Sequence, residues 1–267
     1  IFNIKKTICL FCLIAIMGIG GFTSCNDYLD IDEYIDQMTS IDSVFSRKSL
    51  LEQYINGAAG YLPIAGNLWT NAPLPFQGAS AENFISWNDD WHAATRFLLD
   101  EVTPSNTPFN NYAKYYQGIR MAHNVIQRID EVPDVSDIEK RDFMGRCYYL
   151  IGYYYSLLVL QYGPVPIVPN TPFKPDDPVE VMAKERATYE ECIAYIQEYM
   201  TLAAQYLPLE RENESLITLP TRWAAIANLS RMTLYAASPW YNGNKFYSDW
   251  TRASDGQHFI PQDGVNS

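Results

Sequence analysis

The chain has 267 residues, of which 48% are hydrophobic, and its 19 Lys+Arg against 31 Asp+Glu give a formal net charge of −12. This length and apolar content suit one large globular domain or two small ones, and they exclude a largely disordered chain. The negative charge argues against nucleic acid as a partner, because the phosphate backbone would be repelled.

Residues 1–24 are expected to form a signal peptide that is removed from the mature protein. Lys5 and Lys6 precede an apolar run over 7–21, which is too short for a comfortable membrane span. Small residues lie directly before Cys25, as a lipoprotein signal peptidase requires, so we expect lipid attachment at Cys25. An ordinary signal peptide with a chance cysteine nearby is the alternative.

Loss of residues 1–24 removes Lys5 and Lys6 but no acidic residue, so the formal net charge moves from −12 to −14. Anionic lipid head groups would repel such a body. We therefore predict that the membrane is reached through acyl chains rather than through a basic patch.

The mature chain is expected to consist of a lipidated N-terminal tether, 25–45, followed by an α-helical domain, 46–267. The tether is polar and acidic immediately after Cys25. The chain begins with Ile1 and ends in a polar stretch without the signs of a finished element. We therefore expect it to be a truncated, N-terminal portion of a longer protein.

Apolar residues recur at helical spacing in five stretches, each expected to form a helix: 46–62, 110–129, 136–162, 188–207 and 221–238. No stretch alternates with period two for long enough to build a sheet. The sequence thus predicts an all-α fold with long irregular loops. Stacked antiparallel helix pairs of tetratricopeptide-like type fit this order, although the consensus of that repeat is not legible and the pairs look longer than its ~34 residues.

The stretch 136–162 is the most strongly specified of the five. Ser136 and Glu139 have the spacing of a capping box, and Gly163 can take a left-handed conformation after the last turn. Tyrosines cover nearly every side, so we expect a central helix with neighbours on several faces. Its predicted, mostly apolar core stripe consists of Phe143, Cys147, Leu150, Tyr154, Leu157 and Gln161.

The last two helices carry further expectations. Thr188 and Glu191 form a second capping box at the start of 188–207. In 221–238 we predict that a stripe with Trp223, Ile226, Ala227, Ser230, Leu234 and Ala237 packs tightly against a neighbour. Trp223 and Trp240 are accordingly assigned to packing. Cys147 and Cys192 are expected to be buried free thiols, with a disulfide as the alternative.

Four segments resemble proteins of the SusD/RagB family. They are NDYLD at 26–30, YYQGIRMAHNVI at 115–126, QYGPVP at 161–166 and LYAASPWYNG at 234–243. Their order and their spread over nearly the whole chain make a chance match improbable. Members are about twice as long as this chain, so the resemblance covers roughly their N-terminal half.

The resemblance implies a surface-exposed lipoprotein of the outer membrane, anchored by lipid and built on tetratricopeptide-like helix pairs. Such proteins bind oligosaccharides or other nutrients and pair with a TonB-dependent, SusC-like transporter. They are not enzymes and need no cofactor. A helical-repeat scaffold that contacts only proteins is an alternative function.

The aperiodic segment 66–108 holds the candidate ligand-binding residues. Sugar rings present flat apolar faces rimmed by hydroxyls, so a binding surface combines exposed aromatic planes with polar side chains. This composition selects Trp69, Asn83, Trp87, Asn88 and Trp91. The alternative for Trp87 and Trp91 is that they anchor the loop onto the helices.

Catalytic and metal sites receive little support from the sequence. A glycoside hydrolase would need two carboxylates, for which Glu82 with Asp89 or Asp90 are the candidates, but nothing fixes their separation. The histidines stand alone, and no HExxH or paired CxxC motif occurs, so no metal site is expected.

Overall fold

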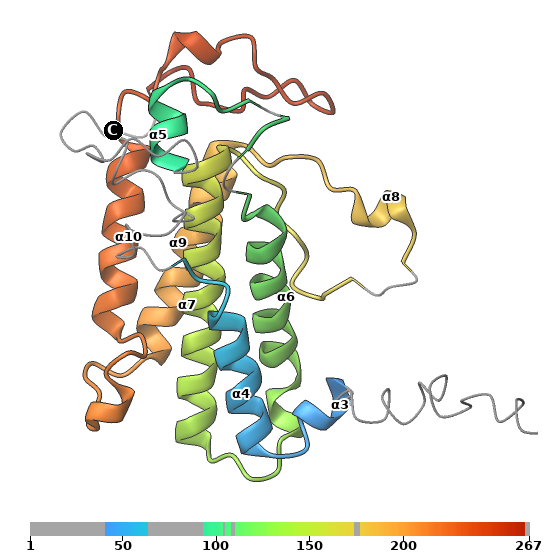
Figure 1. Ribbon diagram of the computed structural model, residues 1–267, viewed down its shortest axis with the longest axis vertical. Coiled ribbons are helices and arrows are strands. Elements are labelled where there is room, and N and C mark those ends of the chain that lie inside the picture. Colours follow the sequence, from blue (N-terminus) through green and yellow to red (C-terminus); the bar gives the residue numbers. More distant parts are fainter. Residues whose placement is uncertain (1–40, 64–92, 104, 108–109, 174–176, 265–267) are drawn as a thin grey trace, which may run out of the picture. The chain divides into compact units, whose positions relative to one another are not determined.

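The computed structural model describes residues 41–63, 93–103, 105–107, 110–173 and 177–264. The chain divides into two units, Ile1–Val44 and Phe45–Ser267. In the first unit the described residues form one short helix, α3 (Ile41–Val44). All other described elements belong to the second unit (Figure 1).

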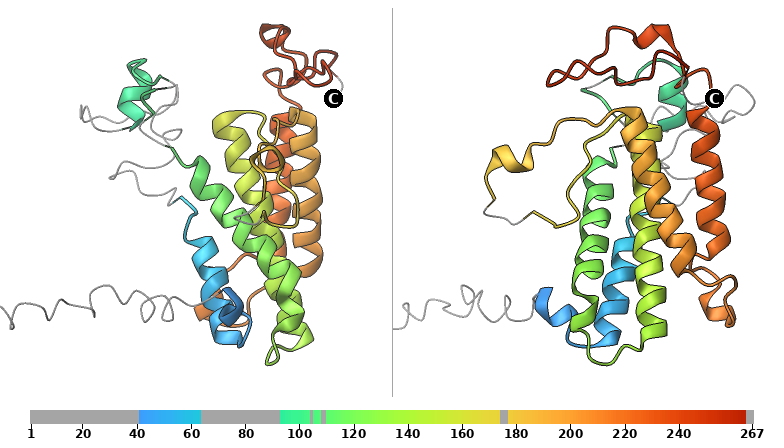
Figure 2. Two further views of the ribbon diagram at one scale, coloured as in Figure 1. Left: turned by 90° about the vertical axis from the view of Figure 1, so that its right-hand side faces the viewer. Right: turned by 180° about the vertical axis from the view of Figure 1, so that it is seen from behind.

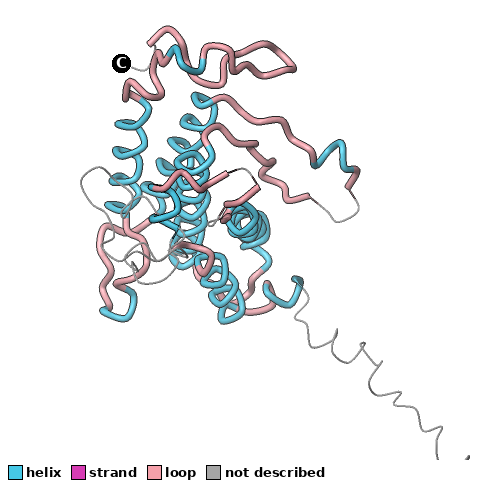
Figure 3. Tube along the Cα trace, turned by 45° about the horizontal axis from the view of Figure 1, so that its top comes forward, coloured by secondary structure: helices cyan, strands magenta, loops and turns pink. Residues whose placement is uncertain are grey.

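The second unit is helical throughout its described residues. Its helices are α4 (Lys48–Ala59), α5 (Ala93–Leu98), α6 (Tyr112–Arg128), α7 (Asp137–Tyr162), α8 (Val179–Met182), α9 (Tyr189–Tyr206) and α10 (Arg222–Ala236). Short 3-10 turns lie at η2 (Ile129–Glu131), η3 (Glu214–Leu216) and η4 (Lys245–Tyr247). The described chain contains isolated bridges but no strand (Figure 3), which confirms the predicted all-α class.

The long helices form two antiparallel pairs, α6 with α7 and α9 with α10, and α7 also packs against α9 (Figures 1 and 2). α7 contacts α4, α6, α9 and α10, so it is the central helix that the sequence predicts. None of the described helices is both long and apolar enough to cross a bilayer.

Both ends of α7 follow from local chemistry. The Ser136 hydroxyl accepts from the Glu139 N–H at 3.4 Å, and the Glu139 carboxylate accepts from the Ser136 N–H at 3.0 Å. Gly163 ends the helix with φ +69°, a value that favours glycine. Five members of the predicted core stripe are confirmed, since Phe143, Cys147, Leu150, Tyr154 and Leu157 are all buried. The sixth, Gln161, is only half-buried near the end of the helix.

Glycines allow the central helices to approach one another closely. A Cβ added to Gly118 on α6 would lie 2.7 Å from Cζ of Tyr154 on α7, and one added to Gly152 would lie 2.9 Å from Cε of Met200 on α9. The tyrosine ring and the thioether thus occupy the space that side chains would need.

Cys147 and Cys192 are buried free thiols, as predicted. Burial raises the pKa of the Cys147 thiol to about 12 and that of the Cys192 thiol to about 11. Both groups are therefore protonated and unreactive in the folded protein.

The predicted core stripe of α10 is wrong within the described chain. Trp223, Ile226 and Leu234 are 59%, 40% and 71% exposed, and the other members of that stripe are exposed as well. The helix instead buries Ala225, Asn228, Met232 and Ala236. On this face the Asn228 amide donates to the buried Ser156 hydroxyl on α7 at 2.9 Å, a tertiary pairing that the periodicity of apolar residues does not reveal.

Candidate functional site

The site residues expected from the sequence lie outside the described residues. They are Cys25 for lipid attachment and Trp69, Asn83, Trp87, Asn88 and Trp91 for ligand binding. The acidic residues considered for hydrolysis, Glu82, Asp89 and Asp90, lie outside them too. The geometry of a site is therefore built from other residues.

An aromatic cluster follows α10, formed by Trp240, Phe246, Tyr247 and Trp250. Tyr247 lies at its centre, edge-on to Trp240 at 5.7 Å and to Phe246 at 5.1 Å between ring centroids. Trp240 is 54% exposed and Phe246 is 83% exposed. The assignment of Trp240 to packing is thus wrong within the described chain, and two large exposed aromatic rings flank Tyr247.

Asn244 fixes the conformation of the cluster. Its side-chain oxygen accepts from the Phe246 N–H at 3.0 Å, which caps η4, while its amide group donates to the Trp240 carbonyl at 3.2 Å. Lys245 donates to the Gln262 carbonyl at 2.7 Å, and Gln262 in turn donates to the Asn244 carbonyl at 3.1 Å. The two exposed rings are therefore held on one folded turn rather than on a free loop.

Aromatic contacts tie this turn to α9. Trp250 packs against the buried Phe259 with 4.8 Å between ring centroids. The Phe259 carbonyl accepts a hydrogen bond from the Tyr189 N–H at 2.8 Å. The Tyr189 ring stacks on the Tyr241 ring, with 4.3 Å between ring centroids and an angle of 6° between the ring planes. Residues that follow the aromatic cluster thus connect it to the first residue of α9.

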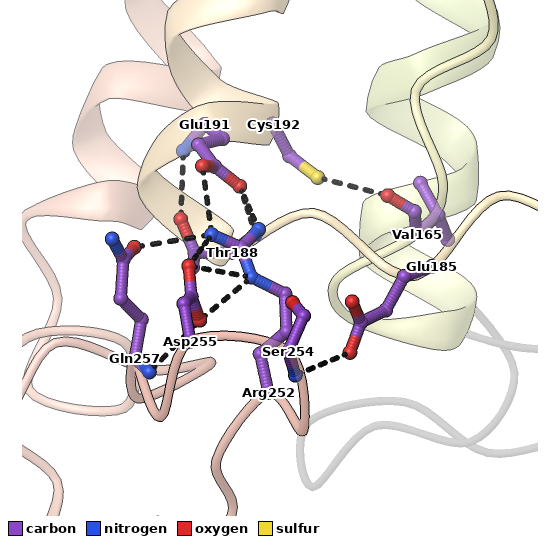
Figure 4. A network of polar contacts seen from close by, with 9 residues as sticks. All are labelled: Val165, Glu185, Thr188, Glu191, Cys192, Arg252, Ser254, Asp255 and Gln257. Atoms are coloured by element: carbon purple, nitrogen blue, oxygen red, sulfur yellow. Dashed lines mark hydrogen bonds and ion pairs between the residues drawn. The ribbon is translucent and has the colours of Figure 1, made fainter.

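A charged network strengthens the same junction (Figure 4). Arg252 donates to Glu191 and to Asp255, each at 2.6 Å, and to the Gln257 side chain at 3.2 Å. Glu191 also accepts from the Thr188 N–H at 2.7 Å, which completes the predicted capping box of α9. The Arg252 guanidinium lowers the pKa of Glu191 and of Asp255, so both carboxylates stay charged near neutral pH.

This arrangement suits binding rather than catalysis. Exposed rings can cover the apolar face of a cyclic ligand, while neighbouring polar side chains hydrogen-bond its rim. Within the part of the chain that the structure describes, no group of three His, Cys, Asp or Glu residues is placed to hold a metal ion.

Sequence reasoning missed most of this cluster. Trp240 was assigned to packing, and Phe246 and Tyr247 were not singled out. The signal was present, because residues 240–250 combine aromatic with Asn, Asp and Lys side chains in an aperiodic segment. The same criterion, applied to the segment 66–108, selects Trp69, Asn83, Trp87, Asn88 and Trp91.

Comparison with known proteins places the chain in a family. The sequence profile of a SusD-like family, described as starch-binding associating with outer membrane, matches residues 27–234. The chain belongs to the SusD-like family. The resemblance seen in the sequence is thereby confirmed. No curated protein sequence matches the chain.

Solved structures of SusD-like proteins share the fold. The chain is similar to BT4246 with a TM-score of 0.69 and 22% identity, over 82% of this chain and 37% of that one. It is also similar to a SusD-like protein (BF3747) from Bacteroides fragilis, with a TM-score of 0.61 and 23% identity, over 74% of this chain and 37% of that one. For surface glycan-binding protein A from Bacteroides thetaiotaomicron, solved in complex with laminarihexaose, the TM-score is 0.52 and the identity 16%, over 71% of this chain and 39% of that one. The SusD-like chain thus spans well under half the length of these proteins.

Proposed function

We propose that this SusD-like chain is the N-terminal portion of a surface-exposed outer-membrane lipoprotein, anchored through Cys25, that captures oligosaccharide and passes it to a TonB-dependent, SusC-like transporter. The observation that carries the glycan-binding part is a folded, exposed aromatic cluster on a chain of a starch-binding family. The laminarihexaose bound by one structural neighbour indicates the kind of ligand to try first.

The energetics require more than one aromatic ring. Covering about 100 Å² of apolar surface on one ring gives roughly 2.5 kcal/mol before ordering costs. Binding in the millimolar to micromolar range needs about 4 to 8 kcal/mol. Trp240 and Phe246 together reach the lower end, and hydrogen bonds from the polar rim supply the rest.

The aromatic residues predicted in the 66–108 segment remain part of the proposal. Trp69, Trp87 and Trp91, with Asn83 and Asn88, would provide further platforms and hydrogen bonds to the same class of ligand. Replacing Trp87 and Trp91 together by Ala is expected to lower affinity for the cognate oligosaccharide. Unchanged affinity would remove these two residues from the site.

The decisive experiment compares the exposed rings of the aromatic cluster with a similarly exposed tryptophan outside it. Laminarihexaose and starch oligosaccharides are titrated calorimetrically against the parent protein, a Trp240→Ala/Phe246→Ala double variant and a Trp223→Ala control. Trp223 is exposed on α10 and is not a member of the cluster. We expect the double variant to lose at least about tenfold in affinity and the control to stay within about twofold. Equal affinities in all three would refute the aromatic cluster as the glycan site.

Anchoring is tested separately. A Cys25→Ser variant is expected to leave the outer-membrane fraction and appear in the soluble fraction, because the acyl chains that would hold the acidic protein at the membrane are absent. Membrane fractionation equal to that of the parent protein would contradict the lipid anchor.

A protein-binding scaffold is the second candidate function. The exposed apolar side chains Trp223, Ile226 and Leu234 on α10 favour it, since contiguous apolar surface commonly marks protein contacts. A glycan array combined with an assay for reducing-sugar release separates the possibilities. Binding without sugar release supports capture, sugar release supports a glycoside hydrolase, and no response in either assay supports the scaffold.

A further inference from the structure

A cavity lies between α6 and two stretches on the α6 side of the bundle: residues 163–173, which follow α7, and residues 177–188, which carry α8 and lead into α9 (Figure 1). The cavity, here called the α6 pocket, has a volume of about 260 Å³ and is lined by Tyr116, Arg120, His123, Val168, Pro169, Pro172, Phe173 and Met182. It shares no residue with the aromatic cluster.

The outer wall of the α6 pocket is held in place by hydrogen bonds to the helices. The Val168 N–H donates to the Tyr155 hydroxyl at 3.0 Å. Gln127 on α6 donates to the Asn170 carbonyl at 2.7 Å, and the Tyr116 hydroxyl donates to the Pro166 carbonyl at 2.6 Å. These bonds tie residues 166–170 of the wall to α6 and α7.

The chemistry of this wall is apolar. Val168, Pro169, Pro172, Phe173 and Met182 provide its side chains. The planar phenylalanine ring and the compact proline rings offer hydrocarbon surface on which the apolar face of a six-membered ring can lie. A volume of about 260 Å³ is just below the range of roughly 300 to 1,000 Å³ found for pockets that bind drug-sized molecules, so the pocket fits one ring rather than a chain of rings.

The opposite side of the pocket carries a single charge. Arg120 and His123 lie three residues apart on α6 and so share one helical face. His123 is only 2% exposed, and burial lowers its pKa to about 4, so it is neutral at physiological pH. Among the lining residues only Arg120 is then charged, and none of the ion pairs found between described residues involves it. Arg120 is exposed, so among the described residues its charge is the one that an anion in the pocket could meet.

We propose that the α6 pocket binds the uronic acid ring of an acidic oligosaccharide. The ring face would lie on the proline and phenylalanine wall, and its carboxylate would pair with Arg120, whose planar donors match a carboxylate in two parallel hydrogen bonds. Phosphate or acetate would leave the apolar wall unused, and a neutral sugar would leave the guanidinium without a partner. This inference rests on the proposed glycan-binding function and names a class of sugar for it.

The test measures discrimination between acidic and neutral sugars. Glucuronate and galacturonate are titrated against the protein by NMR chemical shifts, in parallel with glucose and galactose. We expect the uronates to bind at least about tenfold more tightly than the neutral sugars, because the charge-assisted pair between the carboxylate and Arg120 adds to their affinity. The preference is expected to shrink when NaCl rises from about 0.05 to about 0.5 M.

Two variants that remove the same charge from the same helix form a matched pair. Arg120→Met is expected to abolish the preference for uronates, whereas Lys114→Met is expected to retain it, because Lys114 is exposed on α6 but does not line the pocket. Equal binding of acidic and neutral sugars, or equal losses in both variants, would overturn the proposal. Benzoate binding as tightly as the uronates would also overturn it, in favour of a site for aromatic carboxylates.

The outcomes distinguish this inference from the proposed function. Laminarihexaose is neutral, so its binding at the aromatic cluster is expected to survive Arg120→Met. If laminarihexaose binds while uronates show no preference, only the α6 pocket proposal fails. If neither neutral oligosaccharides nor uronates bind, glycan capture itself fails.

Discussion

Gly118 provides a sharp test of the packing between α6 and α7, because the same substitution is expected to have opposite effects at two helical glycines. A Cβ at Gly118 would lie 2.7 Å from Cζ and 3.0 Å from the hydroxyl of Tyr154. Tyr154 is fully buried, its hydroxyl donates to the Ala58 carbonyl, and its ring lies 5.6 Å from that of Tyr115. The ring thus has no free space into which to move.

The two energetic terms can be compared. Replacing glycine by alanine in a helix gains about 1 kcal/mol of helix propensity. Overpacking a well-packed core costs about 1 to 3 kcal/mol, and a contact below 3.0 Å with a wedged ring belongs at the upper end. We therefore expect Gly118→Ala to lower the free energy of unfolding by about 2 kcal/mol.

Gly57 on α4 is the matched control. A Cβ there would meet only Cε of Met121 at 3.5 Å, an ordinary contact, and the position is exposed. Gly57→Ala should therefore raise the free energy of unfolding by about 0.5 to 1 kcal/mol. Urea denaturation followed by circular dichroism measures both variants. A Gly118→Ala variant as stable as the parent protein would refute the close approach of α6 and Tyr154.

Three further predictions concern buried groups. The pKa of His123 is about 4 in the folded protein against 6.5 for an exposed histidine. Its contribution to the free energy of unfolding is therefore complete above about pH 6.5, and about 3 kcal/mol is lost as the pH falls through 4. A His123→Gln variant should show a shallower acid dependence in urea denaturation, and an unchanged dependence would contradict the burial of this imidazole. Asn228→Ala should lower the free energy of unfolding by about 1 to 2 kcal/mol, since it removes the hydrogen bond to Ser156, and a thermal melt that does not shift would count against that bond. Cys147 and Cys192 should react with a thiol reagent only at the rate of unfolding, so rapid modification of either under native conditions would contradict its burial.

The central helix was predictable from the sequence because every signal for it is local. Ser136 and Glu139 cap one another across three residues, and Gly163 takes the positive φ that its position requires. The core stripe of α7 is mostly apolar, and α7 has neighbouring helices on several sides. Its apolar residues are therefore buried without the need to predict which neighbour covers which side. Local chemistry and burial therefore agree along this helix.

α10 shows where such reasoning fails. Two faces of this helix have acceptable helical spacing, and the more apolar one, with Trp223 and Leu234, was the natural choice for the core. The structure buries the other face, in which Asn228 looks unfavourable until its partner Ser156 on α7 is known. A polar residue becomes a good core residue only through such a partner, which may be any distance away in the sequence.

The binding surface was hidden for a related reason. Composition identifies aromatic residues but not their exposure, which depends on what the rest of the fold covers. Tyr189, Tyr241 and Phe259 belong to the same junction as Trp240 and Phe246. Tyr189 and Phe259 are buried there, whereas Trp240 and Phe246 face solvent. Asn244 joins the backbone at Trp240 to that at Phe246 through its side chain, and both of these rings are exposed. An Asn followed by Lys and Phe carries no such information until the carbonyl to which its amide donates is known.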